Sequence, residues 1–309
     1  MDNSGELFCS IHNHTIFCDG QDDVESMCRA AYEKNLYSIG FSSHAPSEKQ
    51  LGRELFWNMK EENINNYINE VHAAKERWQG KIKVFLGLEV DYVKGKRSPA
   101  DNDIKSLNLD FIIGSVHHLC TGFKGQAICS GACAECNKHS DKLIIVDDSM
   151  EEFTRGLNDG YGKNAEKLMN SYYDAVLEMI DLGGFDILGH ADILKKNTIN
   201  RNLWPKDNEI KRQREVAEAV SKKDIVIEVN TGGINRKKIN EVYPSLTFLR
   251  IIQEYNIPVV ITADAHNIND INGNYNAAVE TLKMADINKH YIFNGKSNNK
   301  TDWLIENIK

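Results

Sequence analysis

The segment Ser10-Ile11-His12-Asn13-His14-Thr15 ends the first short apolar run of the chain, and Asp19-Gly20 follows closely. In a β-strand, residues i and i+2 point to the same side, so we expect the imidazoles of His12 and His14 to aim at one point. Two converging imidazoles are what a shared metal ion requires. Paired histidines also arise by chance on surfaces, so the rest of the chain decides what this pair means.

Short β-rich runs alternate with longer helical patterns along the chain, which is typical of βαβ units and a parallel sheet. Strands buried on both faces read as continuous apolar runs, as Val84-Phe85-Leu86-Gly87-Leu88 does. The predicted strands span residues 7–11, 38–42, 84–88, 111–116, 185–188, 225–229 and 259–262, with a further candidate at 291–294; the predicted helices span 23–34, 58–78, 164–182, 208–222, 245–255 and 269–285.

Either an open doubly wound sheet or a closed barrel would fit this alternation. Side chains with functional chemistry follow every predicted strand, whereas in an open sheet they would cluster at one switch point. The pattern therefore favours an α/β barrel of seven strands. We see no linker or internal repeat that demands a second domain.

Composition limits the partners of the protein. The 309 residues are 41% hydrophobic and 27% charged, with a net charge of -8, which argues against unassisted binding to nucleic acid or to acidic membranes. Residues 1–6 lack a basic patch followed by an apolar core, and no apolar run is long enough for a membrane span, so we expect no signal peptide and a cytoplasmic location. Seven cysteines, an odd count, fit a reducing compartment.

Side chains able to bind metals follow all seven predicted strands. Seven of the ten histidines lie at predicted strand ends, and the C-terminal ends of the strands form the face on which barrel enzymes build their active sites. In chain order these residues are His12, His14 and Asp19; His44; Glu89; His117 and His118; His190; Glu228 and Asn230; and Asp264 and His266.

This set exceeds the needs of one tetrahedral ion and suits two or three ions that share bridging carboxylates. Mixed nitrogen and oxygen ligands favour Zn, Mn or Fe over Mg or Ca. Such a site generates hydroxide at neutral pH and clamps a phosphoryl group, which indicates a hydrolase of phosphate esters. A barrel amidohydrolase is the rival interpretation, but it normally recruits a lysine for a bridging carbamate, and no lysine ends a predicted strand here.

The order of these motifs resembles the PHP (polymerase and histidinol phosphatase) superfamily, from Ile11 to about Phe293. Its pattern is His-x-His, a single His, a Glu, further His residues and a final Asp-x-His. The segments that look like its monofunctional histidinol-phosphate phosphatase branch are Gly87-Leu88-Glu89-Val90-Asp91-Tyr92, Gly114-Ser115-Val116-His117, Gly189-His190-Ala191-Asp192, Glu228-Val229-Asn230-Thr231-Gly232 and Tyr243-Pro244-Ser245.

The resemblance implies a distorted (βα)7 barrel of the TIM-like type, in a single domain over residues 1–309. It implies a trinuclear divalent metal centre (Zn, Mn or Fe) and hydrolysis of L-histidinol phosphate to L-histidinol and phosphate, a late step of histidine biosynthesis. It also distributes nine ligands over three metal sites: His12, His14, Glu89 and Asp264 at the first; Glu89, His117 and His190 at the second; and Asp19, His44 and His266 at the third. Many members have a histidine in place of Asp19, and a carboxylate there shifts the preference slightly toward Mn or Fe.

The substrate-binding residues are predicted from charge. Arg236 is our main candidate for gripping the phosphate, because a guanidinium binds phosphate bidentately, and the resemblance also implies a phosphate-binding arginine nearby. Lys195 and Arg201 are further candidates, although either could be a solvated surface charge. His118 is included among the substrate-binding candidates, and we expect it to point away from His117 along the strand. Protonation of the leaving group is assigned to Asp264 or to a metal-bound water.

An insertion at about 119–146 departs from the family pattern, because it holds Cys120, Cys129, Cys133 and Cys136. It is either an accessory zinc site or redox-sensitive loop, or a glycine-rich lid with reduced thiols, and we favour the lid. We also consider Trp57, Tyr92, Tyr161 and Tyr243 as aromatic residues of the substrate pocket.

Two other functions remain open at this point. One is a PHP-type phosphoesterase that acts on nucleotides or other small phosphate esters, and the other is a regulatory metal-binding protein without turnover. The absence of a basic stripe speaks against polymeric nucleic acid. We therefore expect a small-molecule phosphate ester as partner, with neither nucleic acid nor membrane, and leave the oligomeric state open.

Overall fold

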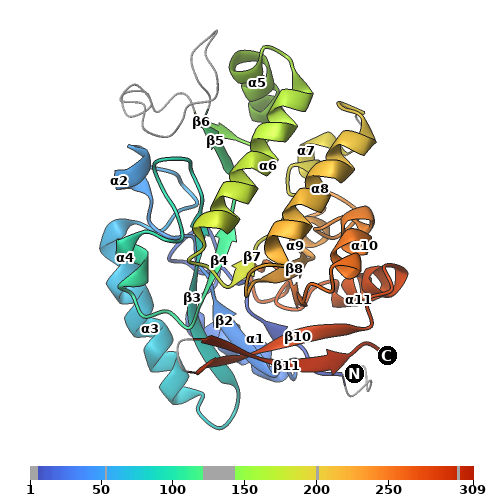
Figure 1. The fold of residues 1–309 in the computed structure, drawn as a ribbon. Helices are drawn as coiled ribbons and strands as arrows, with labels where there is room; N and C mark the ends of the chain where they lie inside the picture. Colours follow the sequence, from blue (N-terminus) through green and yellow to red (C-terminus); the bar gives the residue numbers. More distant parts are fainter. Residues whose placement is uncertain (1–5, 53, 121–142, 200–201, 298–299) are drawn as a thin grey trace.

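Seven parallel strands follow one another around a barrel in this computed structural model, which describes residues 6–52, 54–120, 143–199, 202–297 and 300–309 (Figure 1). Each predicted strand run from 7–11 to 259–262 contributes one of them, which confirms the predicted α/β barrel. Their spatial order is β1 (Cys9–Ser10), β2 (Ser38–Phe41), β3 (Lys83–Asp91), β4 (Phe111–Ser115), β7 (Ile187–Leu188), β8 (Val226–Asn230) and β9 (Val259–Thr262).

The ends of the sheet meet at the His-x-His segment itself. The amide of His14 donates to the carbonyl of Ala265 over 2.8 Å, and the amide of Ala265 donates to the carbonyl of His12 over 3.0 Å. Asn13, between the two histidines, points the other way and donates to the carbonyl of Gly40 over 2.7 Å. The first and last strands are therefore joined by the backbone that carries His12, His14 and the segment after Asp264.

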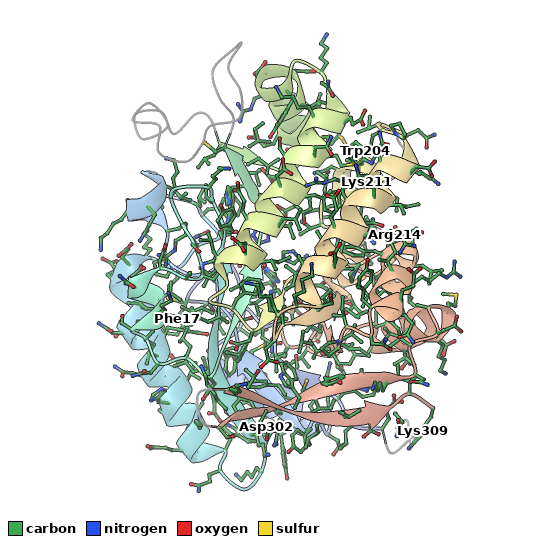
Figure 2. The ribbon with its side chains drawn as sticks, in the orientation of Figure 1. Phe17, Trp204, Lys211, Arg214, Asp302 and Lys309 are labelled. Atoms are coloured by element: carbon green, nitrogen blue, oxygen red, sulfur yellow. The ribbon has the colours of Figure 1, made fainter. Side chains whose placement is uncertain are left out.

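Helices cover the outside of the barrel. In α8, Lys211 and Arg214 are exposed (Figure 2), whereas Val216, Ala217 and Val220 are buried against the core. This spacing is the amphipathic pattern that the sequence predicted. The six predicted helices correspond to α1 (Val24–Glu33), α3 (Ile64–Arg77), α6 (Ala165–Leu182), α8 (Lys206–Val220), α10 (Leu246–Glu254) and α11 (Tyr275–Met284).

Helix starts are well predicted where a side chain caps them. Asp23, Asn164 and Ser245 each accept a hydrogen bond from a backbone amide in the first turn of α1, α6 and α10. The predictions for 58–78 and 269–285 begin several residues too early. The first of these helices is preceded by the 3₁₀ turn η1 (Glu61–Asn63), and the second begins only after Asn274, whose φ of 56° is left-handed.

Several short elements between the strands were not predicted. They are α2 (Glu48–Leu51), α4 (Asn102–Lys105), β5 (His118–Cys120), β6 (Leu143–Ile145), α5 (Met150–Tyr161), α7 (Lys195–Thr198) and α9 (Gly232–Asn235). Strands β5 and β6 pair antiparallel on either side of residues 121–142, which lie outside the described residues together with Cys129, Cys133 and Cys136. Among the described residues, no helix is both long enough and apolar enough to cross a bilayer.

A β-hairpin closes the opposite end of the barrel. Strands β10 (Lys289–Ser297) and β11 (Lys300–Asn307) pair antiparallel outside the seven-stranded sheet, near the two chain termini (Figure 1). The candidate run at 291–294 is thus a strand of this hairpin and not of the barrel. Phe293 lies at its centre, with its ring 4.8 Å from that of Phe85 and 5.2 Å from that of Phe111.

Candidate metal centre

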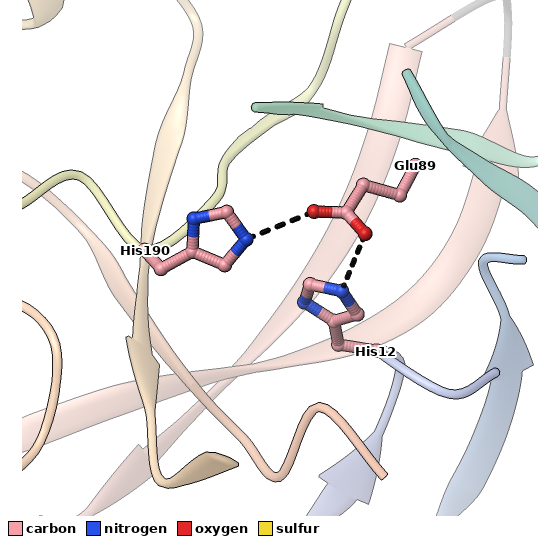
Figure 3. Close-up of side chains that lie close together, drawn as sticks. All are labelled: His12, Glu89 and His190. Atoms are coloured by element: carbon pink, nitrogen blue, oxygen red, sulfur yellow. Dashed lines mark hydrogen bonds and ion pairs between the residues drawn. The ribbon is translucent and has the colours of Figure 1, made fainter. Parts of the chain in front are cut away.

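The carboxylate of Glu89, near the end of β3, is the centre of a buried cluster of histidines. Its Oε2 lies 3.3 Å from Nε2 of His12 and 3.2 Å from Nδ1 of His44, and its Oε1 lies 2.9 Å from Nε2 of His190 (Figure 3). His117 is a little farther away, with Nε2 at 3.7 Å from Oε1. Glu89 is 1% exposed, so this carboxylate, in contact with side chains from four other strand ends, is almost completely buried.

A second group adjoins the first through His14. Its Nε2 lies 3.3 Å from Oδ1 of Asp264, and its ring stacks on that of His266 at 4.2 Å and lies 4.5 Å from that of His44. Nε2 of His266 in turn lies 3.2 Å from Oδ2 of Asp19. The structure therefore brings all nine predicted ligands together at the C-terminal end of the barrel, although their role as ligands remains a prediction.

Several side-chain nitrogen and oxygen atoms that could bind a metal ion in this cluster make no hydrogen bond to the part of the chain that the structure describes. Among the described residues, Nε2 of His12, Nε2 of His14, Nδ1 of His44 and Oδ1 of Asp19 are buried without a hydrogen bond. Unpaired buried polar atoms are costly, so a converging set of them fits bound cations. Imidazole and carboxylate donors are the set that Zn, Mn and Fe accept. The groups close enough to share an ion are His12-Glu89-His190, His12-His14-Asp264, His14-His44-Glu89 and His14-Cys18-Asp19.

A second layer of carboxylates orients the imidazoles. Nδ1 of His12 lies 2.7 Å from Oε2 of Glu228, and Nδ1 of His117 lies 2.6 Å from Oδ1 of Asp91. If Nδ1 carries the proton in each ring, Nε2 is left as a lone-pair donor that faces the cluster. The sequence placed Glu228 at a strand end but assigned it no role. Its position two residues before Asn230, on the same face of β8, was the available signal.

Burial and neighbouring charges give His14 and Glu89 the charge states that metal ligands need. Burial lowers the pKa of His14 to about 3, and the neighbouring His266 and His44 add to this effect. Burial alone would raise the pKa of Glu89, but His44 and His12 hold it well below its usual value. A neutral imidazole beside an ionised carboxylate is the combination that binds a divalent ion.

Arg236 lies at the edge of the cluster and is fixed by Asp264. Its Nη2 donates to Oδ2 of Asp264 over 2.8 Å, and its Nη1 donates to the carbonyl of the same residue over 2.8 Å. Burial opposes ionisation of Asp264, but Arg236 and His12 hold its pKa well below the usual range. Gly232 makes room for this pair, because a Cβ there would lie 2.9 Å from Nη2 of Arg236 and from Oδ2 of Asp264.

A pocket of about 220 Å³ opens above the cluster, which suits a small metabolite. Only some of the predicted substrate-binding residues line this pocket. Arg236 and Trp57 line the pocket, but Lys195 does not: its ammonium donates to the carbonyl of Val242 and lies over the ring of Tyr243. The pocket lining is Asp19, His44, Phe56, Trp57, Glu89, His117, Ile145, Asp147, Asp148, His190, Ile193, Lys196, Arg236, Lys238, Asp264 and His266.

His118 faces away from this pocket, as the alternation along the strand predicted. Its ring stacks on Trp57 at 5.8 Å and lines a different cavity, together with Tyr161. The structure thus does not bring His118 or Lys195 to the pocket with Arg236, because β5 and α7 direct both side chains elsewhere. Arg201 lies outside the described residues. Asp147 and Lys196 line the pocket and were missed, because Asp147 lies in the connection between β6 and α5 and Lys196 in the short helix α7, and neither segment has a recognisable pattern.

Comparison with known proteins agrees with this geometry. The family model of the PHP domain matches residues 10–232, which is more than half of the chain. The chain belongs to the PHP domain family. A relative from Deinococcus radiodurans named "Probable histidinol-phosphatase" is 26% identical over 89% of this chain and 92% of its own length.

Solved structures of two similar proteins share the fold. The hisK protein of Listeria monocytogenes aligns with a TM-score of 0.71 at 23% identity, over 87% of this chain and 98% of that chain. A histidinol phosphate phosphatase from Lactococcus lactis, complexed with Zn, L-histidinol and phosphate, aligns with a TM-score of 0.61 at 18% identity, over 96% of this chain and 98% of that one. Both likenesses support the distorted barrel that we predicted.

Proposed function

We propose that this protein is a metal-dependent phosphatase that hydrolyses L-histidinol phosphate to L-histidinol and phosphate. The observation that carries the proposal is the convergence of buried histidines and carboxylates on Glu89, beside the guanidinium of Arg236, in a barrel of the PHP domain family. The names of similar proteins support the choice of substrate, since the Lactococcus lactis structure holds Zn, L-histidinol and phosphate.

The residues of the cluster would hold three divalent ions, with Zn, Mn and Fe as the candidates. When bound, such ions supply Lewis acidity, which activates water and neutralises the phosphoryl oxygens. Glu89 would be the shared ligand, because its two oxygens face different histidines. The three sites would be His12, His14, Glu89 and Asp264; Glu89, His117 and His190; and Asp19, His44 and His266.

Arg236 would bind the phosphate. Asp264 fixes its guanidinium at one edge, so the orientation is set before substrate arrives and less entropy is lost on binding. Asp264 would serve as a ligand and as the anchor of Arg236, because a carboxylate in an ion pair at 2.8 Å is poorly suited to donate a proton. Lys196 and Lys238 line the same pocket and add positive charge at its edge.

A substrate panel tests the proposal. Phosphate release is measured from L-histidinol phosphate, 5′-AMP and p-nitrophenyl phosphate, with metal-stripped protein as the control. We expect the highest kcat/KM for L-histidinol phosphate and no turnover without metal. A kcat/KM no better than that for p-nitrophenyl phosphate would reject the specific substrate and favour a broader phosphoesterase, whereas no turnover of any ester by metal-loaded protein would favour the regulatory metal-binding protein.

The remaining expectations stay predictions. These are the single domain over residues 1–309, the small-molecule partner without nucleic acid or membrane, and the cytoplasmic location. The role of the Cys-rich insertion also stays a prediction, because three of its four cysteines lie outside the described residues.

A further inference from the structure

The pocket above the metal cluster has two chemically different halves. The inner half consists of Arg236 and all the predicted metal ligands except His12 and His14, and its chemistry suits a phosphate. The outer half consists of aromatic, aliphatic and charged side chains from four separate segments of the chain. We call this half the rim, and it comprises Phe56, Trp57, Ile145, Asp147, Asp148, Ile193, Lys196 and Lys238.

Asp147 is the acidic residue of the rim that lies deepest. Its side chain is 19% exposed, whereas the neighbouring Asp148 is an exposed residue. Lys196 fixes Asp147 by two contacts. Its Nζ donates to the backbone carbonyl of Asp147 and lies 3.6 Å from Oδ2 of the same residue. Asn197 adds a second tie, because its Nδ2 donates to the carbonyl of Val146 over 3.0 Å. The carboxylate is therefore held at the pocket wall by the start of α7.

The wall formed by Phe56 and Trp57 is apolar. Phe56 is 81% exposed, which is unusual for a large aromatic residue, and its ring meets that of Trp57 edge to face at 4.8 Å. Trp57 is itself fixed by stacking on the buried ring of His118. A planar ring of a ligand would find an aromatic surface here and would cover part of Phe56.

We propose that the rim is the subsite for the leaving group and that Asp147 pairs with an ammonium group on the carbon next to the ester carbon. This assignment rests on the proposed function. With the phosphate at Arg236 and the metal cluster, the rest of the ester points to the rim. At the rim, the carboxylate of Asp147 would pair with the ammonium group, and Phe56 and Trp57 would pack against the planar ring of the leaving group. The chemical class recognised is thus the phosphate ester of an amino alcohol that carries a flat side chain.

The test is a cycle of two proteins and two substrates, in metal-loaded enzyme. The substrates are L-histidinol phosphate and 3-(imidazol-4-yl)propyl phosphate, which is the same alkyl ester without the amine. The proteins are the wild type and Asp147→Asn. For the wild type we expect kcat/KM to be about 10- to 100-fold lower on the ester without the amine, which is the scale of one hydrogen bond to a charged group. For Asp147→Asn we expect this preference to vanish.

The outcomes separate the alternatives. Equal losses of Asp147→Asn on both esters would overturn the proposal, because Asp147 would then act on the shared chemistry, for example as a proton donor. A larger loss of the amine preference in Asp148→Asn than in Asp147→Asn would overturn the choice of residue. Unchanged metal content and melting temperature of Asp147→Asn exclude a folding defect as the cause of the lost preference.

Failure of the proposed function gives a different result. If the wild type does not favour L-histidinol phosphate over p-nitrophenyl phosphate, that function is wrong. The rim is then tested with O-phosphoethanolamine against ethyl phosphate, which differ by the same ammonium group. A preference for the amine that disappears in Asp147→Asn supports the proposal in that case too, and no preference in the wild type overturns it.

Discussion

The two ends of the barrel bury opposite kinds of side chain. At the C-terminal end, His12, His14 and Glu89 are almost completely buried, although each carries polar atoms. At the other end, Phe111 and Phe293 are equally buried in an apolar cluster beneath the hairpin. Burying polar atoms is unfavourable unless they are paired, whereas burying aromatic rings is favourable. The apolar cluster at the hairpin end therefore stabilises the fold, whereas the buried polar cluster at the other end costs stability unless cations or other partners compensate it.

Replacing the central carboxylate should have the largest effect on activity. We expect Glu89→Gln to lower kcat/KM by more than about 100-fold, beyond the loss typical of residues that only orient a metal ligand. Bound metal should also fall, because the amide lacks the negative charge between His12, His44 and His190. Phosphate release and elemental analysis measure both effects. Glu178→Gln, which removes a charge near Tyr92 and Lys94 outside the pocket, is the matched control. Full activity of Glu89→Gln would contradict the account.

The hairpin end should show the reverse behaviour. We expect Phe293→Ala to lower the free energy of unfolding by about 3–5 kcal/mol, since it removes a buried ring packed on Phe85, Phe111 and Trp303. The kcat/KM of the folded variant should stay close to that of the wild type. Urea unfolding and phosphate release at low temperature measure the two quantities. For stability, the exposed Phe56→Ala is the control, with a change within about 0.5 kcal/mol. A Phe293→Ala variant that is folded but inactive would contradict the claim that the hairpin end serves stability and not activity.

Gly20 allows a close backbone contact at the polar end of the barrel. A Cβ at Gly20 would overlap the backbone of His14 and Thr15, so the loop that carries Asp19 must move away. For Gly20→Ala we expect a loss of about 1–3 kcal/mol in stability and weaker binding of the metal near His266. Urea unfolding and metal titration measure these changes. Gly80→Ala is the control for metal affinity: its φ of 79° strains an alanine, but a Cβ there contacts nothing. Equal metal affinity of the two variants would refute the proposed close contact.

His290 gives the hairpin end a pH dependence. Burial lowers the pKa of its imidazole from 6.5 to about 4, and the ring stacks on Phe8 with Glu6 as the facing charge. Between pH 6.5 and about pH 4, the unfolded chain binds more protons at His290 than the folded chain does. The free energy of unfolding therefore falls as the pH is lowered through this range. From pH 7.5 to pH 5, the wild type should lose about 2 kcal/mol more than His290→Phe. Urea unfolding of both proteins in the same metal state measures this difference, and parallel pH profiles would contradict it.

The sequence predicted the seven barrel strands because their burial on both faces leaves continuous apolar runs. It missed β5, β6 and α5, which flank residues 121–142. Helix α5 did carry a local signal, because Ser149 caps its first turn and Phe153, Leu157 and Tyr161 form a buried face with helical spacing. Strands β5 and β6 lie at the edge of the barrel, where pairing across a long insertion decides the structure and local pattern does not. The early start predicted for the helix after residue 269 has a similar cause. Asn274 in a left-handed conformation, and not hydrophobic periodicity, sets where α11 begins.

The convergence of the candidate metal ligands was predictable because strand ends of a barrel meet on one face, so residues as distant as His12 and Asp264 could be placed together. The residues of the rim were not predictable in the same way. Asp147 lies in the connection after β6 and Lys196 in the short helix α7 after β7, and only the fold brings them to one pocket. His118 and Lys195 show the converse, since a suitable residue type near a motif still points elsewhere when its own element directs it away.

The most direct measurement returns to the His-x-His segment. The metal content, phosphatase activity and circular dichroism of His14→Ala are compared with those of the wild type. Because His14 joins the group around Glu89 to the group around Asp19, the account predicts about one metal ion fewer per chain, loss of phosphatase activity and an unchanged fold. Unchanged metal content with full activity, or global unfolding of the variant, would contradict a functional metal centre at this end of the barrel.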